Sequence, residues 1–277
     1  MSVLELETEV RAGARPGPRP QSRRLPGRSW HRWISPLVLV VAWQIASATG
    51  LLPTRLLAAP STIAATALDL VRDGTLPTAI AVSLQRVLAG FAAGAVAGVG
   101  TALVAGLSRA GENAVDPIMQ MLRALPFFGL IPLFILWFGI GETPKVLLVA
   151  LAVSFPLYLN TFAGIRGVDG KLAEVARTLK LGRAQLVRHI VLPGALPQTL
   201  VGLRQSLGVA WLALIVAEQI NADAGLGYMI NDAREFLRTD VIVVGLLVYS
   251  ALGLLTDALV RLLERRALTW RREFLSR

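Results

Sequence analysis

The chain has 277 residues, of which 54% are hydrophobic and 17% are charged, and it contains no cysteine. The lack of cysteine excludes a disulfide framework, a cysteine-ligated metal site and a thiol nucleophile. A formal charge of +10 would suggest a polyanionic partner for a soluble protein, but the mean hydropathy of +0.59 is high for such a protein. The uncharged runs of the chain therefore decide its class.

Residues 1–33 are rich in proline, glycine and arginine and carry few apolar side chains. This composition predicts a disordered, basic tail. A cleavable secretory signal is the alternative, because a basic region precedes an apolar stretch in which Ala46-Ser47-Ala48 imitates a cleavage site. Cleavage would leave five spans and put the C-terminus on the wrong side of a membrane, so the uncleaved tail is the favoured interpretation.

Six apolar stretches follow, each close to the roughly 20 helical residues that cross a hydrocarbon core about 30 Å thick. They are continuous rather than alternating, which favours helices over a barrel. The sequence predicts an all-α integral membrane protein whose membrane domain covers residues 34–265, with six transmembrane helices over 34–56, 87–107, 124–141, 146–165, 197–217 and 241–260.

Three of these spans carry further signals. In the second, Gly90, Gly94, Gly98 and Gly106 stand four or eight residues apart, which predicts close packing against a neighbouring helix. Pro126 and Pro132 in the third, and Pro156 in the fourth, predict kinks, because proline lacks an N–H and clashes with the preceding helical turn.

The basic residues indicate the orientation of the chain. Of its 28 Lys and Arg, 21 lie in residues 1–33, 108–123, 166–195 and 261–277. The positive-inside rule places these segments, and hence both termini, in the cytoplasm, and residues 266–277 become a second basic tail. Membrane topology explains most of the net charge, so no nucleic acid partner is expected.

The sequence pattern offers no site for ATP or a metal. The only Gly-Lys pair, Gly170-Lys171, lacks the glycine spacing of a phosphate-binding loop. Histidine occurs only at positions 31 and 189, which is too scattered for an evident metal site. We therefore expect that the chain does not bind ATP through such a loop and has no evident metal site.

The polar connection over residues 166–196 is patterned as two short helices. Asp169 can cap the first, on which Leu172, Val175, Ala176 and Leu179 form an apolar stripe. Gly182 suits the turn, and the second helix is expected over 184–192, before Pro193 and Pro197 redirect the chain into the next span. The stripe either packs on the chain's own helices or docks a partner, and periodicity alone leaves both open.

This segment resembles the EAA loop of ABC importer permeases, with Glu174, Ala176, Ile190, Leu192 and Pro193 at the matching positions. It departs from the family pattern in two places, since Val175 replaces an alanine and Lys180 stands where the turn glycine is usual. The resemblance covers roughly residues 35–265 and is closest to the nitrate/sulfonate/taurine branch, through the segments 83–91, 192–197, 202–204, Trp211, 217–218 and 225–227.

The resemblance implies the permease subunit of a type I ABC importer in the bacterial cytoplasmic membrane, surrounded by lipid. Such a subunit is not itself an enzyme and binds no cofactor. It pairs with a second copy, docks two separate ATPase subunits that bind the ATP, and receives its solute from an extracytoplasmic binding protein. Alternating access would carry a small anionic or zwitterionic solute, such as an aliphatic sulfonate, taurine or nitrate. The residues implied in ATPase coupling are Glu174, Val175, Ala176, Leu179, Lys180, Gly182, Ile190, Leu192 and Pro193.

Three alternatives remain open at the level of sequence. A related permease could carry a pyrimidine-type vitamin precursor. A secondary transporter would show buried ionisable pairs and an internal repeat, neither of which is evident. A membrane scaffold would leave the patterned loop without an ATPase partner.

Polar residues within the spans are candidates for the translocation path, because an ionisable group at membrane depth usually faces a cavity or a partner. For Arg204 the alternatives are an anionic solute and helix-end carbonyls, and for Arg86 they are the path and snorkelling at the outer end of its helix. Segment 218–240 is expected to be a solvated loop or a docking surface for the binding protein. The path candidates are Arg86, Ser154, Asn160, Arg204, Gln205 and Glu218.

Overall fold

The computed structural model describes residues 31–53 and 56–269, and every regular element in those ranges is helical. The disorder predicted for the N-terminal tail lies outside the described residues. In chain order the elements are α2 (His31–Ala48), α3 (Pro60–Arg72), α4 (Thr75–Leu107), α5 (Arg109–Ala124), η1 (Phe127–Leu130), α6 (Ile131–Phe138), α7 (Glu142–Arg166), α8 (Gly170–Thr178), α9 (Arg183–Leu186), η2 (Val187–Val191), α10 (Leu192–Asn221), α11 (Leu226–Glu235) and α12 (Thr239–Ala267).

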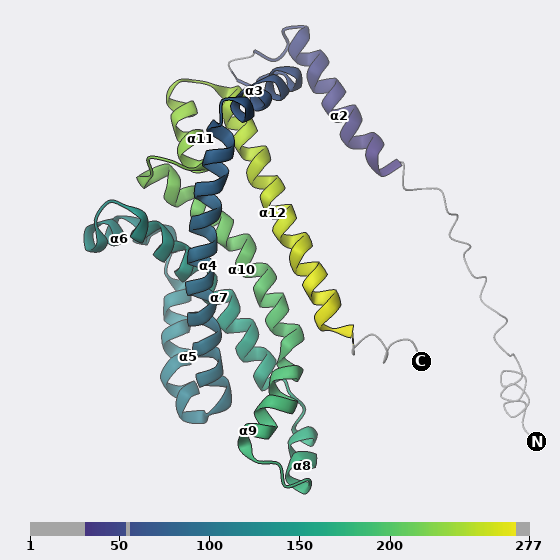
Figure 1. Ribbon diagram of the computed structural model, residues 1–277, viewed down its shortest axis with the longest axis vertical. Helices are drawn as coiled ribbons and strands as arrows, with labels where there is room; N and C mark the ends of the chain where they lie inside the picture. The colour runs from purple at the N-terminus through teal and green to yellow at the C-terminus, as the bar shows by residue number, and fades with distance from the viewer. Residues whose placement is uncertain (1–30, 54–55, 270–277) are drawn as a thin grey trace, which may run out of the picture. The chain divides into compact units, whose positions relative to one another are not determined.

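Two compact units divide the chain, residues 1–45 and 46–277. In its described part the first unit consists of most of α2, an apolar helix with Pro36 inside it. The second unit holds the remaining helices. Within it α4, α7, α10 and α12 run along one bundle, with α8 and α9 at one end and α3 and α11 at the other (Figure 1).

Four helices in the described residues are long and apolar enough to cross a membrane: 75–107, 142–166, 183–220 and 239–267. A fifth span results if the bent pair 109–124 and 128–138 is counted as one. The predicted first span corresponds to a shorter apolar helix, Ile34–Ala48. The prediction of an all-α membrane protein is confirmed, and by length and composition the described residues give four spans, or five with the bent pair.

Helix α7 lies between α4 and α10 and packs closely against both. Small residues on α4 allow this approach, because a Cβ atom added at Gly90 would lie 2.6 Å from Val149 Cβ, and one at Gly98 would lie 2.5 Å from the Ser154 carbonyl oxygen. Gly94 likewise meets the backbone of Ala150. The predicted packing role of the regularly spaced glycines is confirmed.

The third predicted span, 124–141, is not one straight helix. Helix α5 ends at Ala124, the backbone is extended at Leu125, and the chain continues through η1 into α6 after a bend of 86°. Pro126 explains the break, since proline disfavours helical geometry at the residue before it and removes one backbone donor. The kink predicted at Pro126 is thus a complete interruption, and the helix before it, α5, is formed mostly by the charged segment that precedes the apolar run. Pro132 instead lies in the first turn of α6, and Pro156 lies inside α7, which continues as one helix past it.

Segment 218–240 is not the simple solvated loop that was one of its two expected forms. It contains α11, whose buried face packs against α12, α10 and α4. Apolar residues recur on this helix at the spacing of one helical face, which is why the segment folds back onto the bundle rather than into solvent. The buried residues are Leu226, Gly227, Met229, Ile230 and Ala233.

The chain does not change direction at Pro193, so the predicted redirection into the next span is wrong. Helices α9, η2 and α10 form one continuous helical stretch over 183–220. In its π-helical part the Leu192 N–H donates to the carbonyl of Val187, five residues earlier. This wider turn leaves room for the Pro193 ring, which clashes with the carbonyl four residues earlier in a regular α-helix.

Candidate functional site

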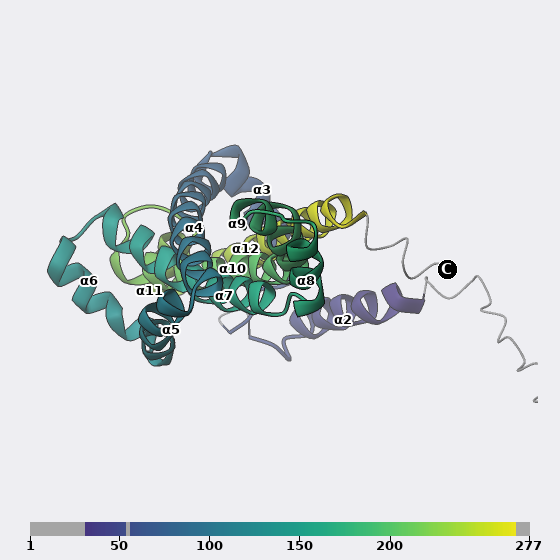
Figure 2. The same cartoon turned by 90° about the horizontal axis from the view of Figure 1, so that it is seen from below.

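Helix α8 begins at the cap that the sequence predicts. The carboxylate of Asp169 accepts a hydrogen bond of 2.9 Å from the Lys171 N–H, which satisfies one of the free donors at the helix start. Figure 2, viewed from the α8–α9 end, shows α8 and α9 lying over the ends of α7 and α10. The two short helices therefore form the terminal surface of the bundle on this side.

The turn between the two helices forms at Lys180, not at Gly182 as expected. Lys180 has φ 53°, in the left-handed region, and the Leu181 N–H donates to the Ala176 carbonyl at 2.9 Å. These are features of a Schellman helix end, at the position that a glycine usually occupies. Gly182 instead is extended, with φ −67°, and its N–H donates to the Gln185 side chain at the start of α9.

Most of the apolar stripe on α8 is uncovered. Leu172, Val175 and Leu179 are 47%, 53% and 66% exposed, and only Ala176, at 2%, is buried against the chain. Within the described residues, packing on the chain's own helices is therefore the wrong interpretation for these three side chains. Because burying each such side chain contributes about 1.5–3 kcal/mol, the stripe is suited to a protein partner.

The other predicted coupling residues surround this stripe. Glu174 is exposed on α8, and its carboxylate makes no hydrogen bond or ion pair with the described part of the chain. Ile190 is partly buried in η2, whereas Leu192 and Pro193 are exposed at the start of α10. The end of the bundle thus presents apolar side chains beside an unpaired carboxylate.

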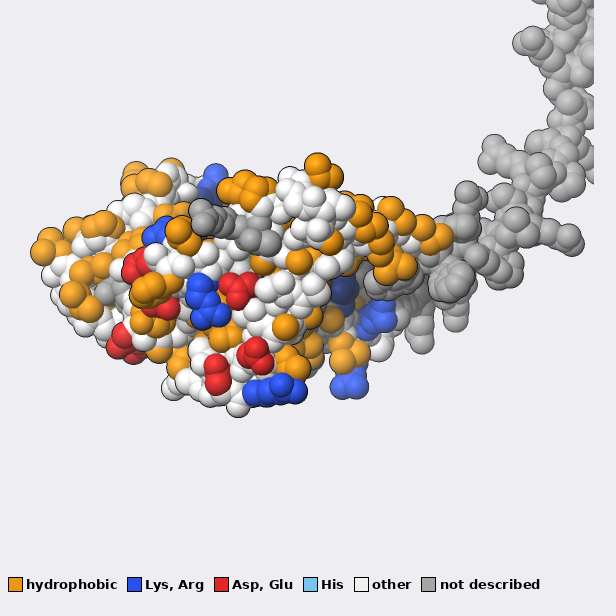
Figure 3. Space-filling view, turned by 90° about the horizontal axis from the view of Figure 1, so that it is seen from above, with side chains coloured by type: hydrophobic (Ala, Val, Ile, Leu, Met, Phe, Trp, Pro, Cys, Tyr) orange, Lys and Arg blue, Asp and Glu red, His pale blue; other side chains and the backbone are white. Residues whose placement is uncertain are grey.

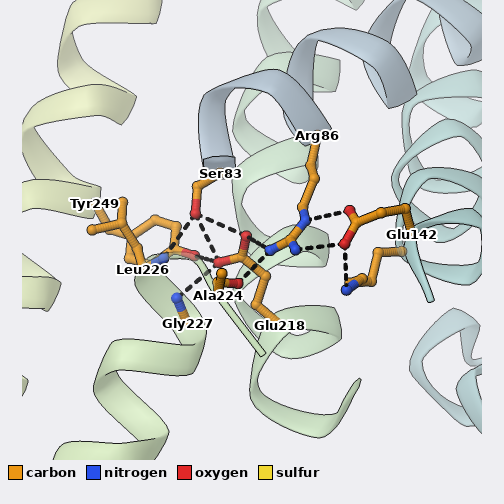
Figure 4. A network of polar contacts seen from close by, with 9 residues as sticks. Ser83, Arg86, Glu142, Glu218, Ala224, Leu226, Gly227 and Tyr249 are labelled. Carbon is orange, nitrogen blue, oxygen red and sulfur yellow. Dashed lines mark hydrogen bonds and ion pairs between the residues drawn. The ribbon is translucent and has the colours of Figure 1, made fainter. Parts of the chain in front are cut away.

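A second polar site lies near the other end of the bundle, around the fully buried carboxylate of Glu218 (Figure 4). Its two oxygens accept hydrogen bonds from the hydroxyls of Ser83 and Tyr249, at 2.8 and 3.0 Å. The Gly227 N–H donates to it at 2.8 Å, and the Ser83 hydroxyl also accepts from the Leu226 N–H. One carboxylate therefore joins α4, α10, α11 and α12.

The guanidinium of Arg86 connects this carboxylate to α7. Its Nη1 donates to Glu218 at 2.8 Å and to the Ala224 carbonyl, while Nε and Nη2 form a bidentate pair with Glu142 at 2.6 and 2.7 Å. Lys145 contacts the same Glu142 carboxylate at 2.9 Å. Arg86 is 4% exposed, so the prediction that it snorkels to the membrane surface is wrong. In this network the two cations, Arg86 and Lys145, balance the two carboxylates, Glu142 and Glu218.

A cavity of about 370 Å³ borders this network. Its lining includes Gln85, Arg86, Glu142 and Asp223, together with Val82, Ala89, Val146 and Ala224. Figure 3 is viewed from the end of the bundle at which α11 lies, and it shows acidic and basic side chains among apolar ones at that end. Arg86 borders the cavity, but its charge is already neutralised by Glu142 and Glu218. An anion in the cavity would therefore find no unpaired charge on Arg86.

The path candidate Arg204 pairs with a carboxylate and not with helix-end carbonyls. Its Nε donates to Asp257 on α12 at 2.5 Å, and Arg261 contacts the same carboxylate at 2.8 Å. All three side chains are partly exposed. The pair joins α10 to α12, which favours a structural role for Arg204. Its partner is Asp257, where the sequence suggested helix-end carbonyls.

Two other path candidates, Asn160 and Gln205, lie side by side. The Asn160 amide donates to the Gln205 carbonyl oxygen at 2.9 Å and itself accepts from Gln198 at 2.8 Å. The sixth candidate, Ser154, is buried and donates to its own helix at the Leu151 carbonyl. The six candidates are therefore not one site: Arg86 and Glu218 share one network, and the amides form another.

Several residues of these networks are not identifiable from the sequence alone. The Glu218 network includes Glu142 and Lys145 from α7 and Tyr249 from α12, which are separate from α10 in the sequence. Gln198 lies on α10, and no motif in the sequence marks it. The signal for Ser83 and the glycines of 225–227 is their presence in the segments that carry the family resemblance. In the described residues, no group of three or more potential ligands is placed to hold a metal ion.

The fold defines a multi-pass membrane protein, and the uncovered stripe on α8 leaves apolar side chains exposed at one end of its bundle. The family described as "Binding-protein-dependent transport system inner membrane component" matches residues 90–269. The chain is 44% identical over 256 residues to the aliphatic sulfonates transport permease SsuC of Bacillus subtilis, covering 91% of this chain and 93% of the relative. It is 48% identical over 238 residues to SsuC of Escherichia coli, covering 86% and 90%.

Among solved structures, an amino acid ABC transporter matches the fold with a TM-score of 0.61 at 19% identity, over 72% of this chain and 97% of that chain. The protein belongs to the binding-protein-dependent transport system inner membrane component family. It is an ABC importer permease, a transport subunit without catalytic activity, and separate ATPase subunits hydrolyse the ATP.

Proposed function

We propose that this chain forms the transmembrane path of a bacterial cytoplasmic-membrane importer for aliphatic sulfonates. Two copies would pair, with six spans each and both termini in the cytoplasm, and would accept solute from an extracytoplasmic binding protein. Two ATPase subunits would dock on the α8–α9 surface. The substrate class rests on the similarity over nine-tenths of the chain to relatives named for aliphatic sulfonates, which favours it over a pyrimidine-type precursor.

The observation that carries the coupling role is the uncovered stripe of Leu172, Val175 and Leu179 on α8. The stripe is joined to the continuous helix 183–220 by a turn over residues 179–182, which the Leu181 N–H closes by donating to the Ala176 carbonyl. A force applied to α8 is therefore transmitted to the membrane-spanning part through one short turn. ATP-driven closure of the ATPase pair can then move α10 as a rigid element. Family membership favours this role over a secondary transporter or a scaffold.

The test is to co-express the tagged permease with the ATPase and binding protein encoded beside it, and to measure co-purification and ATP-dependent sulfonate uptake. Val175→Asp and Leu179→Asp should abolish both, because a carboxylate would be buried unpaired in the docking surface. Leu237→Asp is the matched control for ATPase co-purification, since Leu237 is 79% exposed at the α11–α12 turn. Wild-type levels of co-purification and uptake in both α8 variants would overturn the coupling role.

A further inference from the structure

Three amide side chains form a hydrogen-bonded row across α7 and α10. Gln198 donates to Asn160, and Asn160 donates to Gln205, at 2.8 and 2.9 Å. We call these three residues the amide ladder. In this arrangement the Gln205 amide nitrogen and the Gln198 carbonyl oxygen are left without a partner among the described residues.

The ladder has a specific structural cause in Gly202, which lies on α10 between the two glutamines. A Cβ atom at this position would lie 2.7 Å from Asn160 Cβ and 3.0 Å from the Pro156 carbonyl oxygen. Only a glycine therefore lets the Asn160 side chain lie across α10 and reach the amides on either side. The backbone is built to bring the three amides together.

The amide ladder lies within the predicted fourth and fifth spans, yet its side chains are not covered by the chain. Gln198 and Gln205 are exposed, and Asn160 is partly exposed. Unpaired amide groups in hydrocarbon cost several kcal/mol, so polar groups at membrane depth face a cavity or a partner rather than lipid. The same face of α10 continues to Gly208, where a Cβ atom would meet nothing within 4 Å.

The two arginines among the path candidates are already paired with carboxylates. Arg86 is neutralised by Glu142 and Glu218, and Arg204 is paired with Asp257. An oxyanion that crosses between the helices therefore meets neutral donors and no free arginine of the spans. Neutral donors suit a translocation step, because the solute must bind well enough to enter but weakly enough to leave.

We propose that the amide ladder is a solute-binding step on the translocation path, at which the Gln205 amide donates hydrogen bonds to sulfonate oxygens. The inference rests on the proposed function for its ligand. It assigns direct solute contact to Gln198, which the family resemblance does not single out, and it removes Arg86 and Arg204 from that role.

The first test uses the absence of cysteine from the chain. Gln205→Cys, in the complete assembly in membranes, is treated with a membrane-impermeant methanethiosulfonate reagent that carries a sulfonate. Labelling is expected in at least one nucleotide state, with slower labelling in excess alkanesulfonate. Leu254→Cys is the control, since Leu254 is exposed on the apolar surface of α12 and should stay unlabelled.

Two labelling results would overturn the proposal. One is a Gln205→Cys variant that remains as unreactive as Leu254→Cys in every nucleotide state. The other is cross-linking of two Gln205→Cys chains in place of labelling, because a second copy would then cover this face.

The second test measures uptake. Asn160→Asp places a carboxylate in the ladder without changing its size, and should reduce the maximal rate of alkanesulfonate uptake about tenfold or more through like-charge repulsion. Asn113→Asp, at an exposed position of α5, is the matched control and should keep the wild-type rate. Wild-type uptake in Asn160→Asp would overturn the ladder alone, whereas a wild-type assembly that accumulates no sulfonate would overturn the proposed substrate and the ladder's ligand with it.

Discussion

The guanidinium of Arg86 lies 2.8 Å from the carboxylate of Glu218, 132 positions away in the sequence, and both side chains are buried. The pair is the centre of a network in which every charge has an opposite partner. Such a buried network specifies how α4 and α10 meet, and its removal leaves uncompensated charge within the bundle.

Glu218→Gln should therefore be strongly destabilising. The change keeps the shape of the side chain but leaves Arg86 with one carboxylate and disturbs the acceptors for Tyr249 and Gly227, at a cost of about 3–5 kcal/mol. The melting temperature of the purified protein in detergent measures this effect. Glu235→Gln, at an exposed position of α11, is the control, and equal melting temperatures for the two variants would contradict a structural role for the network.

The glycines of α4 provide a second test. Gly94→Ala should destabilise the α4–α7 contact by about 1–3 kcal/mol, because the added methyl group has no room beside Ala150 and Val153. Gly100→Ala is the matched control on the same helix, since nothing lies within 4 Å of a Cβ there. Both variants are compared by thermal unfolding in detergent, and equal stability would mean that α4 and α7 do not pack this closely.

Lys180→Gly should stabilise the end of α8. Glycine adopts the left-handed conformation without the roughly 1–2 kcal/mol that an L side chain costs there. Amide hydrogen exchange at Leu181, whose N–H closes the helix end, should slow about fivefold or more if this segment opens locally. Gly182→Ala has a permitted backbone conformation and should leave the exchange rate unchanged. Faster exchange in Lys180→Gly would argue against the Schellman end.

The Arg204–Asp257 pair predicts a charge-exchange result. Arg204→Asp places two carboxylates together between α10 and α12 and should lower the yield of folded protein. Adding Asp257→Arg restores opposite charges and should recover most of that yield, although the new arginine lies close to Arg261. Size-exclusion chromatography of the purified protein measures the yield. A double variant no better than the single one would show that the pair does not hold the two helices.

The predictable parts of this fold are those that local patterns determine. Uncharged length locates α4, α7, α10 and α12, and the glycine spacing on α4 indicates its close packing. The cap at Asp169 and the apolar stripe on α8 follow from residues that are neighbours in sequence. These features need no knowledge of the distant parts of the chain.

The errors occur where tertiary contacts decide. The burial of Arg86 depends on Glu142 and Glu218, and its position near the end of a span suggested snorkelling instead. Pro126 indicates the break after Ala124, but the helix before it depends on tertiary contacts: α5 is held to α7 by the Asp116–Tyr158 hydrogen bond and the Glu112–Arg166 ion pair. The amide ladder depends on Gly202, whose role is visible only once two helices are placed together.

The central claim is that the exposed stripe of α8 seats against an ATPase subunit. Photo-cross-linking tests it most directly: a maleimide-benzophenone is attached to Leu179→Cys, the only cysteine of the permease, or to the control Leu237→Cys between α11 and α12. A permease–ATPase cross-link is expected from Leu179→Cys and none from Leu237→Cys. The absence of that cross-link in an assembly that hydrolyses ATP and imports solute would contradict it.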